Sequence, residues 1–118
     1  MSIMYPIKRT FEKSRAENKI IMVLPEFVTT LFYAVSISSE GQGVDDLVLT
    51  KSFDNAEMCV TISPNLNLVE FPEFNVLTIR GRDILKIIPE NSGVIVVYEN
   101  GADYLTSKQV ALFKQVID

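Results

Sequence analysis

The stretch from Gly93 to Ile117 constrains the fold more than any other part of the sequence. It opens with five consecutive apolar residues, Val94 to Tyr98, of which four are β-branched, and turn-forming residues lie on either side. A half-exposed strand would alternate apolar and polar residues, so this run predicts a strand that is covered on both faces. We therefore expect residues 93–98 to form a central strand of a sheet.

A turn and then a helix are predicted after this strand. Residues 99–104 form the turn, and Thr106 is followed three residues later by Gln109, which is the spacing of a capping box. Leu105 and Val110 occupy the two positions of a hydrophobic staple, so the start of the helix is specified twice. The apolar residues of the helix share one face: Val110, Phe113 and Ile117.

Length and residue types limit the classes of function. A chain of 118 residues suits one domain, residues 1–118, with a single core. The sequence has no histidine and a single cysteine, which excludes an internal disulfide and a cysteine-rich zinc site and removes the commonest metal ligand and general base. We interpret Cys59 as a packed thiol, because no histidine is present to generate a nucleophilic thiolate. No cofactor is predicted.

Apolar stretches and charge predict an unprocessed cytoplasmic protein. No stretch approaches the ~20 apolar residues of a membrane span, the first residues lack the order of a signal peptide, and a single cysteine suits a reducing compartment. Residues 1–20 carry five basic and two acidic side chains, although the whole chain has a net charge of −4. The remainder is therefore acidic and disfavours nucleic-acid binding unless the amino-terminal segment acts alone. The alternative for that segment is a solvated helix face balanced by its own carboxylates.

Apolar spacing predicts two helices in the first third of the chain. Pro6 to Asn18 reads as a thin amphipathic helix with Ile7 and Phe11 one turn apart. A second helix begins at residue 24, and its apolar residues recur at helical spacing: Leu24, Phe27, Val28, Leu31 and Phe32. Residues 33–38 then alternate between larger apolar and small residues, which predicts a half-buried strand.

Further strands and a short helix are predicted between residues 47 and 88. Residues 47–52 and 57–63 read as a β-hairpin around an Asp-Asn turn, and residues 76–79 as a strand that leads into a helix at residues 84–88. The loop before the hairpin contains Gly41 and Gly43 but lacks the rest of a phosphate-binding motif. Together these elements predict an α+β single domain, with a mixed, mainly antiparallel β-sheet and about three to four helices packed on it.

The segment around Pro72 is the candidate partner-binding site. Glu70, Phe71, Glu73 and Phe74 set two aromatic rings beside carboxylates, and Pro72 prevents a continuous helix or central strand. Aromatic anchors dominate many protein interfaces, so we predict that these side chains contact a partner with a basic rim. The alternative is a loop that folds back and buries both rings in the domain.

Three basic residues form a candidate anion-binding site in an otherwise acidic part of the chain. Arg80, Arg82 and Lys86 lie close together in the sequence, and arginine and lysine side chains bind anions through charge-assisted hydrogen bonds. The alternative is that Asp83 and nearby acids neutralise this cluster.

Four blocks of the chain follow one another in a recognisable order. They are a helix that runs into a strand, a hairpin that ends in Ser-Pro, a strand followed by Gly-x-Asp-Ile-Leu, and the final strand, turn and helix: Leu24 to Ile37, Leu47 to Pro64, Val76 to Leu85, and Gly93 to Ile117. This order resembles the amino-terminal domain of the SseB (enhanced serine sensitivity) family over about residues 24–117. The resemblance implies a bacterial mixed α and β domain without known catalytic residues. Small single-domain relatives look like proteins that bind another protein, including antitoxin or immunity proteins.

We therefore predict a non-catalytic protein-binding module, with an immunity or antitoxin protein that neutralises a toxin enzyme as one specific form. An acidic surface can occlude the basic active-site cleft of such a toxin and speed the association. A second hypothesis is an enzyme that uses the carboxylates of Glu40, Asp45 and Asp46, with or without a divalent metal, although adjacent aspartates on an extended chain point in different directions. A third is a self-associating regulatory protein that pairs through an edge strand of the hairpin.

Overall fold

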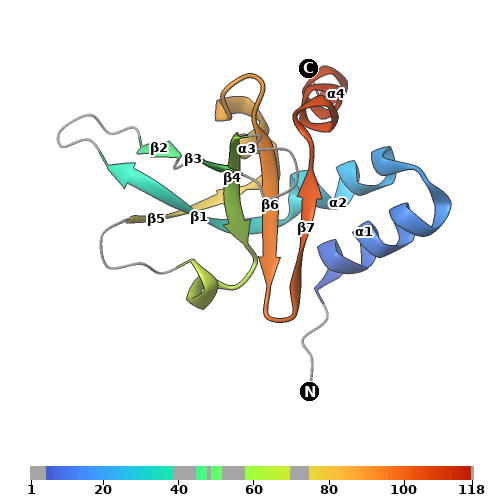
Figure 1. Ribbon diagram of the computed structural model, residues 1–118, viewed down its shortest axis with the longest axis horizontal. Coiled ribbons are helices and arrows are strands. Elements are labelled where there is room, and N and C mark those ends of the chain that lie inside the picture. Colours follow the sequence, from blue (N-terminus) through green and yellow to red (C-terminus); the bar gives the residue numbers. More distant parts are fainter. Residues whose placement is uncertain (1–4, 39–44, 48, 52–57, 70–74, 118) are drawn as a thin grey trace.

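The computed structural model describes residues 5–38, 45–47, 49–51, 58–69 and 75–117 (Figure 1). The fold is α+β, with one mixed sheet and four α-helices among these residues, as predicted. The helical elements are α1 (Pro6–Glu17), η1 (Ile20–Val23), α2 (Leu24–Thr29), η2 (Leu66–Leu68), α3 (Gly81–Ile87) and α4 (Ser107–Ile117). The strands are β1 (Leu31–Ser38), β2 (Asp45–Leu47), β3 (Leu49–Lys51), β4 (Met58–Ser63), β5 (Asn75–Arg80), β6 (Gly93–Tyr98) and β7 (Gly101–Leu105). No helix in the described ranges is long and apolar enough to cross a membrane.

The sheet is mainly antiparallel. β5 pairs with the whole first part of β1, β1 pairs with β4, and β6 pairs with β7, all antiparallel. Between these two halves β4 and β6 run parallel, with Val60 beside Val94 and Ile62 beside Val96. The predicted hairpin is confirmed, because β3 pairs antiparallel with β4, and its turn lies outside the described residues.

β2 and β3 occupy the space between two diverging strands. β1 pairs with β4 only at Tyr33 and Ala34, and farther along β1 its partner on that side becomes β2. β3 likewise pairs with the first half of β4, on the side where Ile62 meets Ala34. β2 and β3 therefore keep the diverging ends of β1 and β4 within one sheet, since each end has a hydrogen-bonded neighbour.

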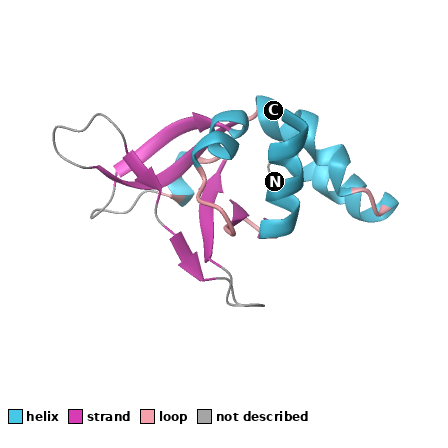
Figure 2. Cartoon of the chain, turned by 90° about the horizontal axis from the view of Figure 1, so that it is seen from above, coloured by secondary structure: helices cyan, strands magenta, loops and turns pink. Residues whose placement is uncertain are grey.

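The four α-helices gather on one side of the strands and bury the main core there (Figure 2). The ring of Phe27 lies 5.3 Å from that of Phe32 and 6.2 Å from that of Phe113, so α2, β1 and α4 meet at one point. The buried residues of this core come from every α-helix and from four strands: Ile7, Phe11, Val23, Leu24, Phe27, Phe32, Ala34, Val60, Ile62, Ile84, Leu85, Ile88, Val94, Val96, Tyr98, Leu105, Val110 and Phe113.

β6 lies inside the sheet, between β4 and β7, as its apolar run predicted. Val94, Val96 and Tyr98 face the helices and are buried, whereas Ile95 and Val97 are only half-buried. The second face of β6 is therefore less covered than a continuous apolar run suggests.

The capping box at the start of α4 is confirmed. The Thr106 backbone N–H donates to Gln109 Oε1 at 2.9 Å, and the Gln109 N–H donates to Thr106 Oγ1 at 3.2 Å. Val110 and Phe113 of α4 are buried, and Ile117 packs against the core. Local sequence signals therefore place this helix correctly.

Two predictions about element boundaries are wrong. The second helix ends at Thr29 instead of reaching Phe32, and Leu31 and Phe32 begin β1, where they pair with Arg80 and Ile79. Positions 31 and 32 fit both a helical and an extended pattern. Pairing with β5 stabilises the extended conformation, so both residues belong to a strand. The predicted turn at residues 99–104 contains most of β7, which pairs with β6 from Gly101 onward.

Gly81 brings α2 and α3 into close contact. Its N–H donates to the Thr30 carbonyl at 3.0 Å, and a Cβ at this position would lie 1.8 Å from the Phe27 carbonyl oxygen. Only glycine allows the two backbones to approach this closely. Gly81 therefore sets the short distance at which the start of α3 packs against α2.

Candidate functional site

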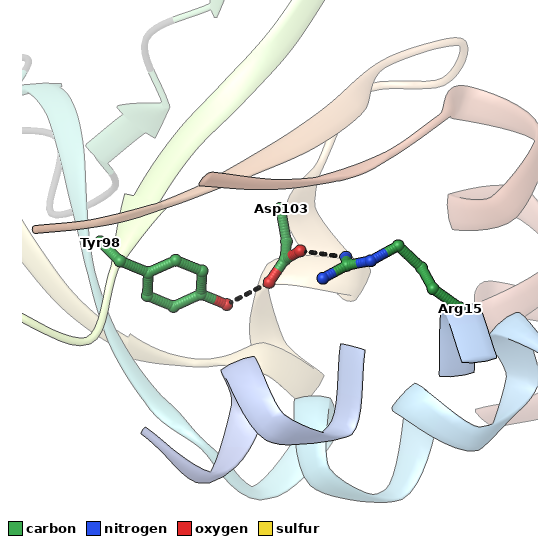
Figure 3. Close-up of polar contacts among 3 residues, drawn as sticks. All are labelled: Arg15, Tyr98 and Asp103. Atoms are coloured by element: carbon green, nitrogen blue, oxygen red, sulfur yellow. Dashed lines mark hydrogen bonds and ion pairs between the residues drawn. The ribbon is translucent and has the colours of Figure 1, made fainter. Parts of the chain in front are cut away.

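A buried carboxylate links the amino-terminal helix to the last hairpin (Figure 3). The side chain of Asp103, in the middle of β7, is 3% exposed. Its Oδ2 accepts a hydrogen bond of 2.8 Å from the Tyr98 hydroxyl, and its Oδ1 forms an ion pair with Arg15 of α1. Both carboxylate oxygens thus have a donor, which offsets the removal of the charge from water.

An aromatic stack extends this cluster toward the start of α1. The Tyr5 and Tyr98 rings lie 5.8 Å apart at an interplanar angle of 24°, and Lys8 Nζ lies 5.5 Å from the centre of the Tyr98 ring. The Tyr5 hydroxyl donates to the Glu99 carboxylate, 3.0 Å from each oxygen. We call these residues, with Arg15 and Asp103, the Asp103 cluster.

The environment keeps both phenols of the cluster protonated. Burial raises the pKa of Tyr98 well above its ordinary value, and the hydrogen bond to Asp103 raises it further. Partial burial and the hydrogen bond to Glu99 also raise the pKa of Tyr5. A phenol whose pKa is raised is a weaker acid and stays protonated at neutral pH, so these hydroxyls serve as hydrogen-bond donors. Through these contacts the Asp103 cluster links α1 to the β6–β7 hairpin.

Sequence reasoning missed this cluster. Arg15 and Asp103 are 88 residues apart, so no local motif joins them. The available signal was an aspartate between the apolar residues Ala102 and Tyr104, within the segment predicted to be a turn. A buried aspartate requires a partner, and the sequence does not say which of its basic residues supplies it.

The predicted partner-binding residues Glu70, Phe71, Glu73 and Phe74 lie outside the described residues. The chain enters the described part again at Asn75, the first residue of β5. The prediction for this segment therefore stays a prediction.

The predicted anion-binding residues lie at the junction of β5 and α3. Arg80 Nη1 donates to the Thr29 carbonyl at 2.8 Å, and Lys86 Nζ lies 3.9 Å from Asp83 Oδ1. Arg82 is exposed. Two of the three cations thus have a partner within the protein, and the exposed pair between Lys86 and Asp83 is weak.

The carboxylates of the enzyme hypothesis are described only in part. Asp45 and Asp46 lie in β2, where their backbones pair with Ser38 and Ile37, and Glu40 lies outside the described residues. Within the described ranges no group of three histidine, cysteine, aspartate or glutamate residues could hold a metal ion.

Cys59 is buried, as the packed-thiol interpretation predicted. A Cβ built on Gly93 would lie 3.2 Å from the Cys59 sulfur and 3.1 Å from the Tyr104 ring. These two side chains therefore meet over Gly93, on the face of the sheet opposite the main core. The thiol is inaccessible to a substrate there.

The second face of the sheet carries partly exposed apolar and aromatic side chains. Strand register puts Tyr33 opposite Thr78 and Ser63, and Ile95 between Thr61 and Tyr104, all on the side away from the main core. We call this surface the open face and define it by its half-buried members on five adjacent strands: Tyr33, Thr61, Val76, Ile95, Val97 and Tyr104.

Two of the surface hollows that border the helices contain both acidic and basic groups, and a third, of about 200 Å³ between α3 and α4, is lined by Lys86 and Lys114. One of the first two, of about 220 Å³, lies between the turn before β6 and α4 and is lined by Glu90 and Lys114 among others. The other, of about 590 Å³, lies beside α1, where Arg9 and Glu12 contribute opposite charges. Because these two hollows combine acidic and basic groups, neither of them presents a convergent site for one kind of ion.

Comparison of the chain with protein-family models, with curated proteins and with solved structures found no match.

Proposed function

We propose that this protein is a non-catalytic protein-binding module, similar in its order of elements to the SseB amino-terminal domain. The observation that carries the proposal is the open face, where half-buried side chains from five adjacent strands lie on one side of the sheet, around the buried Val35, Cys59 and Ser63. Aromatic and branched side chains that keep part of their area exposed gain free energy when a partner covers them. A rigid sheet also presents them without loss of backbone entropy.

The distribution of charge supports a basic partner. Residues 39–74 carry seven acidic side chains and one basic side chain, whereas residues 1–20 have an excess of basic side chains. Two of these acids lie in β2, at the end of β1 that is remote from α1 (Figure 1). A partner with a basic cleft would be steered toward the acidic part of the chain.

An immunity or antitoxin protein is the specific form that we propose. Such a protein neutralises a toxin enzyme by covering its active site, and it needs no catalytic groups of its own. The acidic segment that contains Glu70, Phe71, Glu73 and Phe74 combines the charge and the aromatic anchors that this task requires.

The test begins with the tagged protein as bait in lysate from its source cells, followed by mass spectrometry and a salt series. A captured protein counts only if the purified pair forms a stoichiometric complex whose affinity falls as salt rises. If the partner is an enzyme, the protein must also inhibit it.

Three variants then locate the interface. Phe71→Ala and Glu73→Lys are expected to weaken the complex, and Tyr33→Ala tests the open face. Glu90→Lys is the control for Glu73→Lys, because it makes the same charge change at an exposed residue outside the proposed interface. Affinity unchanged by Phe71→Ala and Glu73→Lys removes that segment from the interface, and affinity unchanged by Tyr33→Ala removes the open face.

A further inference from the structure

β5 is an edge strand whose outer side is open among the described residues. It pairs with β1 along its full length, and no other described strand pairs with it. None of its six residues is buried, whereas β4 and β6 each bury four of six. An edge strand covered by other parts of the protein would lose this exposure.

The sequence of β5 favours pairing with another strand. Its centre, residues 76–79, reads Val-Leu-Thr-Ile and contains neither proline nor a charged residue. Natural sheets protect their edges with lysine, proline, bulges or very short strands, and such devices are absent from these four positions. The one charge of the strand, Arg80, lies at its end, where it bonds to the Thr29 carbonyl.

We propose that β5 pairs antiparallel with β5 of a second copy of this chain, across a two-fold axis that passes through Thr78. Leu77 and Ile79 lie opposite Ala34 and Phe32, on the helix-covered face, and Thr78 lies on the open face. A two-fold axis perpendicular to the sheet keeps each face continuous. It sets Leu77 of one copy beside Ile79 of the other, and Thr78 beside its own symmetry mate.

Electrostatics selects this antiparallel arrangement over a parallel one. In parallel pairing the two Arg80 side chains would be neighbours at the same end. In the antiparallel register each Arg80 lies beside the other copy's Val76, so the two arginines are four residues apart, about 14 Å at ~3.4 Å per residue. That separation exceeds the Debye length of about 8 Å at physiological ionic strength, so the repulsion is screened.

The expected dimer is weak. Pairing of residues 76–80 of the two strands covers the half-buried Leu77 and Ile79 on one face, and it adds little contact area beyond the strand itself. This area is well below the ~1,600 Å² of a standard stable interface, so a dissociation constant in roughly the micromolar range or above is expected. The association does not depend on the partner proposed in the previous subsection.

Sedimentation velocity from about 1 to 500 µM tests the proposal. The expected result is a reversible monomer–dimer equilibrium in the unmodified protein. Thr78→Lys and Thr78→Glu change an exposed residue, so each variant is expected to fold. Each puts two like charges opposite each other at the axis, and should weaken the dimer roughly tenfold. A mixture of the two should restore association, because lysine then faces glutamate. Ala111→Lys, an exposed position on α4, is the control and should associate like the unmodified protein.

Two results would overturn the proposal. One is a single monomeric species at every concentration. The other is a dimer that Thr78→Lys leaves unchanged, or that the mixture of lysine and glutamate variants does not strengthen relative to either variant alone. Neither result bears on a partner bound through the open face, because that binding is measured between different proteins.

Discussion

The buried Tyr98 phenol, which donates a hydrogen bond to Asp103, makes the stability of this protein fall at alkaline pH. The Tyr98 residue is 4% exposed, and the pKa of its phenol is raised, mainly by burial and then by the neighbouring carboxylate. In the unfolded chain a tyrosine loses its proton near pH 10. The folded state therefore holds a proton that the unfolded state releases, and the free energy of unfolding falls as pH rises above about 10.

The size of this loss follows from linkage. When the folded-state pKa lies well above 11, the contribution lost at pH 11 is RT ln(1 + 10^(11−10)), or about 1.4 kcal/mol. The contribution is fully present at pH 8, below the unfolded pKa. Tyr98→Phe removes the titrating group, so this variant should not show that part of the loss. At pH 8 the same variant should be less stable by about 1.5 to 3 kcal/mol, because a hydrogen bond to a charged acceptor is lost.

Urea denaturation of both proteins at pH 8 and pH 11 measures these quantities. The unmodified protein should lose about 1.4 kcal/mol more than Tyr98→Phe between the two pH values. Other titrating groups are common to both proteins and cancel in the difference. Ultraviolet titration of the native protein provides a second readout, because fewer of its four tyrosines should ionise at pH 11 than after unfolding.

Equal losses in the two proteins would refute this reasoning. So would ionisation of all four tyrosines near pH 10 while the protein stays folded. Either result would mean that water reaches the Tyr98 hydroxyl, and that the hydrogen bond to Asp103 does not keep the Tyr98 phenol protonated.

Two further predictions concern local backbone geometry. Gly81→Ala should destabilise the fold by about 3 kcal/mol or more, because the alanine Cβ would lie 1.8 Å from the Phe27 carbonyl oxygen. Thermal unfolding measures this loss, and an unchanged melting temperature would contradict the prediction. Thr106→Ala should reduce the free energy of unfolding by about 1 kcal/mol, because the Gln109 N–H loses its acceptor. Chemical denaturation measures this change. The control Thr106→Ser keeps the hydroxyl and should retain most of the stability.

Elements with local signals were predictable from the sequence. The capping box of Thr106 and Gln109 marks the start of α4, and the apolar run of β6 marks an interior strand, because both signals lie within a few residues. The helix that begins at residue 24 shows the limit of this approach. Leu31 and Phe32 satisfy helical spacing, yet they belong to β1 because β5, more than 40 residues away, offers them partners.

The Asp103 cluster was not predictable for the same physical reason. Aspartate and glycine are uncommon within strands, so residues 99–104 read as a turn. What makes β7 a strand is its pairing with β6, and what allows Asp103 to be buried is Arg15 from the other end of the chain. Gly81 is a similar case, because its necessity depends on the position of Phe27 and not on its neighbours in the sequence.

The contacts of the Asp103 cluster between α1 and the β6–β7 hairpin have a consequence for synthesis on the ribosome. Tyr5 and Arg15 leave the ribosome well before their partners Tyr98, Glu99 and Asp103, which are made about 90 residues later. At about 5–20 residues per second, α1 waits roughly 4 to 18 seconds for these contacts. During that interval Ile7 and Phe11 lack the core residues that the β6–β7 hairpin contributes. The apolar face of α1 therefore stays available to chaperones until β7 has emerged.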